Sequence, residues 1–245
     1  MLRTKEQYHE RLFSMRNNVY IGGQRVGRDD PRLRPGINVL DVTFDLAQDP
    51  RWEGLATAIS SVTREKVNRW SHLPQNPYDL LQKQKLIRLA ARRVGGCIQR
   101  CMGHDAINAL AIYTKEIDEA EGTNYHARFI SYLRGYQLED MDGTCCQTDA
   151  KGDRLKRPSQ QENPDSYVHV VEKKKDGIVV RGVKMSITQA AYADVFFVVP
   201  TRALKEEDTD YAVAFAVPAD EEGIKVVTRP VWLRDKDESH VAPFC

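Results

Sequence analysis

Two cysteines, Cys97 and Cys101, are the residues whose type and spacing most directly suggest chemistry in this chain. They stand four positions apart, with glycines close by on both sides, and a helical apolar pattern follows them. Positions i and i+4 of a helix share one face, so two thiolates would lie about 6 Å apart and bind one metal ion or one iron–sulfur cluster. Free cysteines are also among the most buried residue types. The spacing alone therefore leaves open both a metal site and a pair of small core residues.

Helical patterns surround the cysteines in the first part of the chain. Thr4 and Gln7 have the spacing of a capping box, which predicts a helix that runs to about Arg16. A short extended piece at residues 19–21 and a Gly22-Gly23 turn follow. Apolar periodicity then predicts helices at residues 38–48, 52–69, 78–119 and 124–140, the third broken or kinked near Gly95, Gly96 and Gly103.

The pattern changes from helices to strands near Asp142. Six segments are enriched in Val, Ile, Tyr and Phe and are separated by short turns: residues 144–148, 167–172, 178–186, 193–200, 211–217 and 224–228. Lys175-Asp176-Gly177 is typical of a hairpin turn. We therefore predict an α+β protein, with a helical domain over residues 1–141 and an antiparallel β domain over residues 142–245.

Composition excludes several classes of function. The 245 residues are 41% hydrophobic and 29% charged, with a net charge of +1, which provides no global electrostatic surface for nucleic acid or an acidic membrane. The sequence has no apolar run long enough to span a membrane and begins with a polar segment unlike a signal peptide. Five cysteines indicate a reducing, cytoplasmic location. Since no helix is predicted after the strands to cover the sheet, we expect the front part of a longer protein, a small complete protein being the alternative.

Six segments, in order and spacing, resemble the 4-hydroxyphenylacetate 3-hydroxylase family of flavoproteins, and within it the branch of 4-hydroxybutyryl-CoA dehydratases. The resemblance runs from Met1 to about Thr228, and each segment alone is a weak signal. The segments are Leu46–Pro50, Cys97–Cys101, Asp105–Ala109, Gly122–His126, Thr148–Arg154 and Asp176–Gly182.

The resemblance implies an acyl-CoA-dehydrogenase-like fold, in which a helical domain and a β domain precede a carboxy-terminal helical bundle that this chain lacks. It also implies that Cys97 and Cys101 ligate a [4Fe–4S] cluster, whose other ligands, a histidine and a cysteine of the bundle, lie outside the chain. With two of four ligands, the chain is not expected to hold a stable cluster by itself. By resemblance, the parent protein takes an acyl-CoA substrate and assembles as a tetramer.

A flavin site is likewise implied by the resemblance. A turn that carries Lys, Gly and Arg offers charge and backbone N–H groups to a pyrophosphate. Without the resemblance, a polar loop between domains would be the favoured interpretation. The residues expected to contact FAD are Thr148, Asp149, Lys151, Gly152, Asp153, Arg154 and Thr188.

The chain departs from the dehydratase pattern at two places. Gln189-Ala190-Ala191 follows Thr188 where the dehydratases have a Gly-Ser step, and His104 replaces an apolar residue. We expect His104 to be a partly exposed helix residue rather than a group that supports the metal site. Tyr125 and His126 are candidates to line the site, although a structural role is the favoured interpretation.

Three functions are compatible with these patterns. The first is flavin- and [4Fe–4S]-dependent dehydration of 4-hydroxybutyryl-CoA to crotonyl-CoA, with isomerisation of vinylacetyl-CoA, for which the cysteine pair is the discriminating feature. The second is a reduced-flavin-dependent aromatic hydroxylase of the 4-hydroxyphenylacetate 3-monooxygenase type, which needs no cluster. The third is a non-catalytic, truncated flavin-binding fragment. The sequence identifies no catalytic base in any of them.

Overall fold

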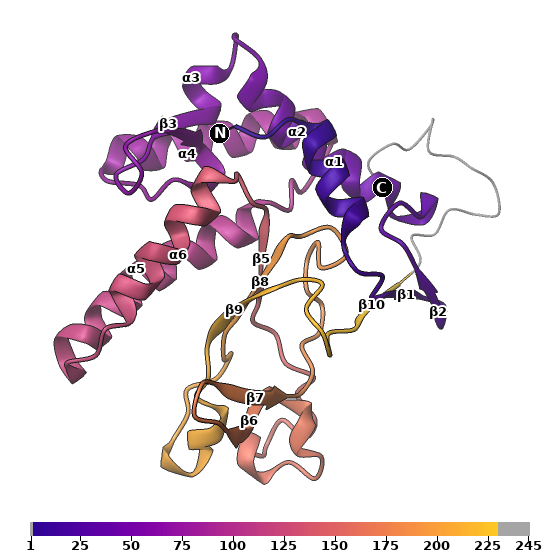
Figure 1. The fold of residues 1–245 in the computed structure, drawn as a ribbon, viewed down its shortest axis with the longest axis vertical. Helices are drawn as coiled ribbons and strands as arrows, with labels where there is room; N and C mark the ends of the chain where they lie inside the picture. Colours follow the sequence, from indigo (N-terminus) through magenta and orange to yellow (C-terminus); the bar gives the residue numbers. More distant parts are fainter. Residues whose placement is uncertain (1, 230–245) are drawn as a thin grey trace.

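A computed structural model describes residues 2–229 of the chain, so the predicted end of the β domain at residues 230–245 lies outside the described residues (Figure 1). The α-helices are α1 (Lys5–Ser14), α2 (Arg34–Gln48), α3 (Glu53–Ala56), α4 (Pro77–Val94), α5 (Cys101–Glu121) and α6 (Tyr125–Leu138). Short 3₁₀ helices cover Pro31–Leu33, Arg69–Ser71, Pro158–Gln160, Pro164–Ser166 and Glu206–Tyr211. The strands are β1 (Val19–Ile21), β2 (Gln24–Val26), β3 (Thr57–Ile59), β4 (Lys66–Asn68), β5 (Gly143–Cys146), β6 (His169–Lys173), β7 (Ile178–Arg181), β8 (Val195–Val198), β9 (Phe215–Pro218) and β10 (Val226–Thr228).

The predicted start of the first helix is confirmed in detail. The Gln7 backbone N–H donates to Thr4 Oγ1 at 3.3 Å, and the Thr4 N–H donates to Gln7 Oε1 at 2.9 Å. This reciprocal capping box satisfies two of the N–H groups that a helix start leaves without partners. The predicted extended piece at residues 19–21 and the Gly22-Gly23 turn are also confirmed, and they form part of the β1–β2 hairpin.

The prediction of a helix over residues 52–69 is wrong. Only α3 is helical there; the chain then forms the β3–β4 hairpin and a short 3₁₀ turn. The buried Arg69 side chain explains the reversal, because it donates to the carbonyls of Leu55 (2.7 Å) and Thr57 (2.6 Å) and thereby ties the end of the hairpin to the end of α3. Apolar periodicity in the sequence does not reveal a contact between residues 14 positions apart.

The sheets are mixed, so the prediction of an antiparallel β domain is wrong in part. β5 pairs with β8 in parallel, and β8 pairs with β9 antiparallel. The long connection between β5 and β8 contains the antiparallel β6–β7 hairpin, turned at the predicted Lys175–Gly177, and this length permits a parallel crossover. β10 pairs in parallel with β1, across the predicted domain boundary at residues 141–142, which stays a prediction.

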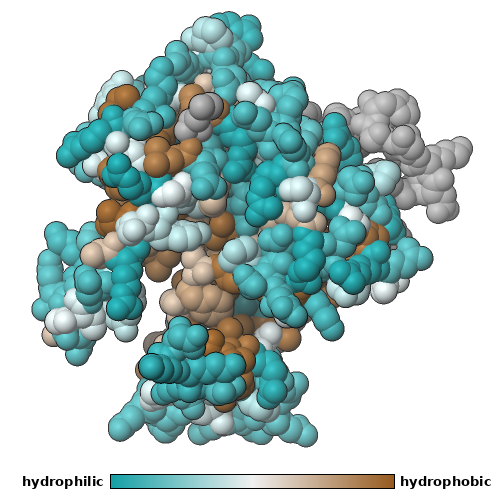
Figure 2. All heavy atoms as spheres, viewed as in Figure 1, coloured by the Kyte–Doolittle hydropathy of each residue, from teal (hydrophilic) through white to brown (hydrophobic). Residues whose placement is uncertain are grey.

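Three buried apolar clusters hold these elements together. One joins α1 and α2 to strands of the β region, the second lies between α2 and α4 around Trp70, and the third lies under α5 and α6 around Phe197 of β8. The α5–α6 hairpin extends away from the other helices (Figure 1). Apolar side chains are visible in the recess between this hairpin and the strands (Figure 2). Within residues 2–229, no helix has the length and apolar character that crossing a membrane requires.

Helix α5 presses directly on β5. Gly103 was predicted as a possible break, yet it lies inside α5, and a Cβ built on it would stand 2.1 Å from the Gly143 carbonyl oxygen. Glycine is thus required here for close approach of a helix to a strand rather than for a turn. The contact places the start of α5 beside the start of β5.

We predict that Gly103→Ala destabilises the chain by about 1–3 kcal/mol, because the added methyl group must separate α5 from β5. Gly135→Ala in α6 is the matched control, since a Cβ at that position meets nothing within 4 Å. The control should stabilise the chain by about 0.5–1 kcal/mol through helix propensity. Urea unfolding of the two variants measures both effects, and equal midpoints would contradict the close packing.

Candidate functional site

The two cysteines lie in, and directly after, the loop that joins α4 to α5. Gly95 caps α4 in the left-handed conformation, with φ of 72°, and the Gly96 N–H donates to the Ala91 carbonyl at 3.1 Å. Since α5 begins only at Cys101, Cys97 lies in the loop. The prediction that one helical turn carries both cysteines is therefore wrong, because the glycine pair ends the preceding helix.

Cys97 nevertheless lies close enough to act on the Cys101 thiol. Cys97 is exposed and Cys101 is half-buried. Burial, and then the charge of the nearby Cys97, raise the pKa of the Cys101 thiol to about 11. Cys101 is thus a neutral thiol near pH 7, and a bound metal ion would be needed to favour its thiolate. Among the described residues, no group of three or more His, Cys, Asp or Glu side chains is arranged to hold a metal ion, so further ligands would have to come from elsewhere.

His104 lies one turn further along α5 and is 1% exposed, so the expectation of a partly exposed histidine is wrong. Its Nδ1 lies 2.9 Å from the Trp70 carbonyl oxygen, which makes Nδ1 the protonated nitrogen. Nε2 has no partner within the described part of the chain. Burial lowers the pKa of His104 to about 4, so the ring is neutral at pH 7.

Arg100, directly before Cys101, is buried in an ionic cluster that sequence analysis did not identify. Its Nη2 lies 2.6 Å from Asp140 Oδ1, and its Nε lies 3.6 Å from Asp142 Oδ1. Asp194 accepts from the Asp142 backbone N–H at 2.9 Å and pairs with Arg3 at 2.7 Å. This buried cluster, consisting of Arg3, Arg100, Asp140, Asp142 and Asp194, connects the cysteine loop to the starts of β5 and β8.

Strand β5 leads from this cluster to the predicted flavin loop. Gly103, two residues after Cys101, contacts Gly143 at the start of β5, and Thr148 follows the end of that strand. Five residues of extended chain span about 16 Å. The two predicted cofactor sites are therefore at opposite ends of one short strand.

The loop after β5 has the features of an anion site. Lys151 and Gly152 have φ of 76° and 49°, and the side chains of Lys151, Asp153 and Arg154 are exposed. The backbone N–H groups of Gly152 and Arg154 have no partner among residues 2–229. Free N–H groups and two cations suit a phosphate. The loop thus offers the donors that a pyrophosphate requires.

Gln161 holds this loop in shape, a role that the sequence did not reveal. Its Oε1 accepts from the Asp153 N–H at 2.9 Å, and its Nε2 donates to the Asp153 carbonyl at 2.9 Å. A Cβ on Gly152 would lie 2.2 Å from Gln161 Oε1, and φ of 49° at this position also favours glycine. A glutamine eight positions away carries no local signal of such a contact.

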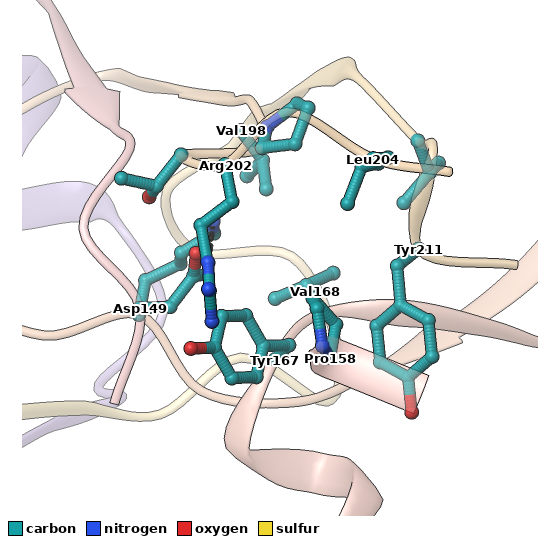
Figure 3. A pocket seen from close by; sticks show the side chains of 12 residues that line it. Asp149, Pro158, Tyr167, Val168, Val198, Arg202, Leu204 and Tyr211 are labelled. Carbon is teal, nitrogen blue, oxygen red and sulfur yellow. Dashed lines mark hydrogen bonds and ion pairs between the residues drawn. The ribbon is translucent and has the colours of Figure 1, made fainter. Parts of the chain in front are cut away.

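Asp149 lies beside the loop but is buried and paired. Its carboxylate accepts from Lys184 Nζ, which also donates to the carbonyls of Gln147 (2.9 Å) and Val199 (2.8 Å). Asp149 lines a recess that is open to solvent, where it lies with Arg202 and Tyr167 opposite Leu204 and Tyr211 (Figure 3). Of the seven predicted flavin residues, only Asp149 lines this recess.

The two predicted threonines lie on segments that the strands bring together. The Thr148 carbonyl accepts from the Met185 N–H at 2.8 Å, and the Thr188 carbonyl accepts from Thr144 Oγ1 at 2.7 Å. Gln189, where the chain departs from the dehydratase pattern, is buried, and its Nε2 donates to the Gly143 carbonyl at 2.7 Å. Gln189 thus supports the start of β5.

Tyr125 and His126 lie far from the cysteines. His126 Nδ1 lies 3.0 Å from Thr114 Oγ1, and its N–H donates to Asp118 at 2.9 Å, near the end of α5. Cys101 begins that helix, and the 13 residues to Thr114 span about 20 Å. Their contacts indicate that these residues join α5 to α6.

Comparison with known proteins gives a family for this arrangement. Residues 4–243 match the family model described as "4-hydroxyphenylacetate 3-hydroxylase N terminal". The chain is 42% identical over 229 residues to the 4-hydroxybutyryl-CoA dehydratase/vinylacetyl-CoA-Delta-isomerase of Clostridium aminobutyricum, covering 93% of this chain and 47% of the relative. It is 28% identical over 237 residues to the oxygenase component of 4-hydroxyphenylacetate 3-monooxygenase from Thermus thermophilus, covering 94% and 47%.

Solved structures agree with these sequence relatives. An archaeal 4-hydroxybutyryl-CoA dehydratase from N. maritimus has a TM-score of 0.89 and 38% identity, over 93% of this chain and 45% of that one. The oxygenase component of 4-hydroxyphenylacetate 3-monooxygenase complexed with FAD has a TM-score of 0.80 and 25% identity, over 99% and 50%. The chain spans about half the length of the curated relatives named above.

We predict that Asp142→Asn removes a pH dependence of stability. Burial raises the pKa of Asp142 to about 7 from 3.8, although Arg100 opposes the rise. The native state therefore holds this proton between about pH 4 and pH 7, and stability falls by up to about 4 kcal/mol as pH rises through that window. Relative to the parent chain, the variant should gain stability between pH 5 and pH 8 in urea unfolding. Asp45→Asn, at an exposed carboxylate, is the control. A difference in unfolding free energy between Asp142→Asn and the parent chain that does not change with pH would contradict the raised pKa of Asp142.

Proposed function

The chain belongs to the 4-hydroxyphenylacetate 3-hydroxylase family, and on that premise we propose that it forms part of a flavin- and [4Fe–4S]-dependent 4-hydroxybutyryl-CoA dehydratase. The observation that carries the proposal is the pair of neighbouring thiols at the start of α5, in a chain 42% identical to such a dehydratase. The activity belongs to the whole enzyme, of which this chain corresponds to about half. The acyl-CoA substrate, a tetramer and a cytoplasmic location are parts of the same proposal.

The residues fit a cluster in part. Cys97 and Cys101 offer two adjacent sulfur ligands, and the described residues provide no third ligand beside them. Thiolates are the usual ligands of iron–sulfur clusters, and two more groups would have to complete the set. In this role both cysteines hold iron and neither acts as a nucleophile.

The loop after β5 fits the pyrophosphate of FAD. Lys151 and Arg154 would pair with its charges, and the free N–H groups of Gly152 and Arg154 would donate to its oxygens. Asp149 is committed to Lys184, so we assign it to shaping the loop rather than to binding the cofactor directly. Asp153, whose carboxylate accepts from the Leu155 N–H at 2.9 Å, has a similar supporting role.

The reaction requires removal of a poorly acidic proton and departure of a hydroxyl group. When bound, flavin and cluster supply redox chemistry and a Lewis acid for these two tasks. This chain's own contribution is to hold the two groups at the ends of β5. His104 is neutral and buried, and it holds the start of α5 through the Trp70 carbonyl. None of the described residues is assigned as the catalytic base.

We predict that Cys97→Ser or Cys101→Ser abolishes iron binding and leaves flavin binding intact. The whole enzyme of which this chain is proposed to form part is purified without oxygen and assayed for iron, sulfide and visible absorption. Cys145→Ser is the control, because this half-buried thiol on β5 has no assigned ligand role. Iron retained in both variants would disprove the cysteine assignment. A parent protein with flavin but no iron would favour the aromatic hydroxylase, and one with neither would favour the non-catalytic fragment.

We also predict that Lys151→Gln combined with Arg154→Gln weakens FAD binding at least about tenfold, because two charge-assisted contacts to phosphate are lost. Lys173→Gln combined with Lys175→Gln is the matched control: it removes the same charge at the exposed β6–β7 hairpin. Titration followed by flavin fluorescence measures both. Equal affinities for the two double variants would contradict the pyrophosphate site.

A further inference from the structure

Arg100 is buried at the end of a loop whose first residues are exposed. It is 2% exposed, whereas Gly95, Gly96 and Cys97 are all exposed. Burying a guanidinium is strongly unfavourable unless charge and hydrogen-bond partners compensate it. Because Arg100 directly precedes Cys101, the burial of its side chain bears on how that cysteine is held.

The Arg100 guanidinium connects three separate segments. Nη2 reaches Asp140 at 2.6 Å, in the connection between α6 and β5, and Nη1 lies 3.2 Å from Thr43 Oγ1 on α2. The guanidinium carbon stands 4.2 Å from the centre of the Phe44 ring, also on α2. Because Asp140 is itself fully buried and accepts from the Arg3 backbone N–H at 3.1 Å, the carboxylate has little freedom to follow a moving loop.

Within the loop, the Gln99 carbonyl accepts from the Met102 N–H at 3.1 Å and from Cys101 Sγ at 3.8 Å. Gln99 has φ of 63°, an uncommon value for a residue with a side chain, and the Arg100 N–H donates to the Ile98 carbonyl at 2.7 Å. Ile98 is buried in the cluster between α2 and α4. The segment between Cys97 and Cys101 thus has an apolar anchor at Ile98, hydrogen bonds to the Gln99 carbonyl and an ionic anchor at Arg100, which directly precedes a cysteine.

Arg100 acts on the thiols through position rather than charge. The charge of Arg100 is directed to the aspartates of the buried cluster. Groups that orient metal ligands without touching the metal commonly change metal affinity 10–100-fold when they are replaced.

We propose that Arg100 is the positioning residue of the cysteine pair: clamped by Asp140 and Asp142, it fixes the loop so that the two sulfur atoms face one ligand-binding position. The inference rests on the proposed function for the identity of the metal group, but the positioning itself concerns the chain alone. It extends the site from the two sulfurs to the buried cluster that joins them to β5.

Thiol alkylation tests the positioning without any cofactor. Cys97 and Cys101 are alkylated with iodoacetamide at pH 8 in the full chain, and each rate is followed by mass spectrometry. Arg100→Lys should raise the Cys101 rate about tenfold or more and leave the Cys97 rate nearly unchanged, since only Cys101 is shielded. Arg28→Lys is the matched control: Arg28 is 1% exposed and binds Arg16 and Asn18, away from the loop.

A second variant distinguishes a specific effect on Cys101 from a faster rate caused by loss of folding. Asp140→Asn keeps Arg100 but removes its closest carboxylate, and it should raise the Cys101 rate in the same direction by a smaller factor. Far-UV circular dichroism confirms that helices persist. A Cys101 rate unchanged in Arg100→Lys, or raised equally in Arg28→Lys, overturns the proposal.

Cobalt binding then tests whether Arg100 also sets the metal affinity of the cysteine pair. Cobalt(II) titration, followed by thiolate charge-transfer absorption with Cys97→Ala as background, should show 10–100-fold weaker binding in Arg100→Lys than in the parent chain. A changed alkylation rate in a parent chain that binds no cobalt at this pair would still support the positioning role, since two cysteines without further ligands are not expected to hold a metal group stably. The iron assay of Cys97→Ser in the whole enzyme tests the proposed function separately. Equal cobalt affinity in Arg100→Lys and the parent chain would overturn the positioning of the pair.

Discussion

The buried cluster of Arg3, Arg100, Asp140, Asp142 and Asp194 is the interaction on which the rest of the molecule depends. Buried charges are tolerated only when each finds a partner, so the elements that carry them must meet in one arrangement. Here they come from the N-terminus, the cysteine loop, the connection after α6 and the segment before β8. The cluster thereby fixes where α5 meets the sheet.

Close packing of glycine on glycine completes that junction. Gly103 on α5 and Gly143 on β5 allow a helix and a strand to approach more closely than side chains would permit. From this junction β5 runs to the Lys151–Arg154 loop, in parallel with β8. One strand thus relates a candidate metal-binding loop to a candidate phosphate-binding loop.

Local patterns predicted the elements that depend on local physics. The Thr4–Gln7 capping box, the Gly22-Gly23 hairpin, the break at Gly95-Gly96 and the turn at Lys175–Gly177 are all present, since each relies on neighbouring residues. The failures share one cause. The 52–69 segment is folded back by Arg69, Gly103 packs rather than breaks, and β5 chooses β8 as its parallel partner through contacts distant in the chain.

By itself, the sequence determined the family, the pair of cysteines and the basic loop that follows β5, because these are properties of residue type and spacing. Only the tertiary structure decided that Cys97 lies outside the helix, that His104 is buried and neutral, and that Arg100 and Gln161 hold the two loops. Burial and ion pairing depend on which distant segments exclude water around a side chain, and that information appears only when the chain is folded.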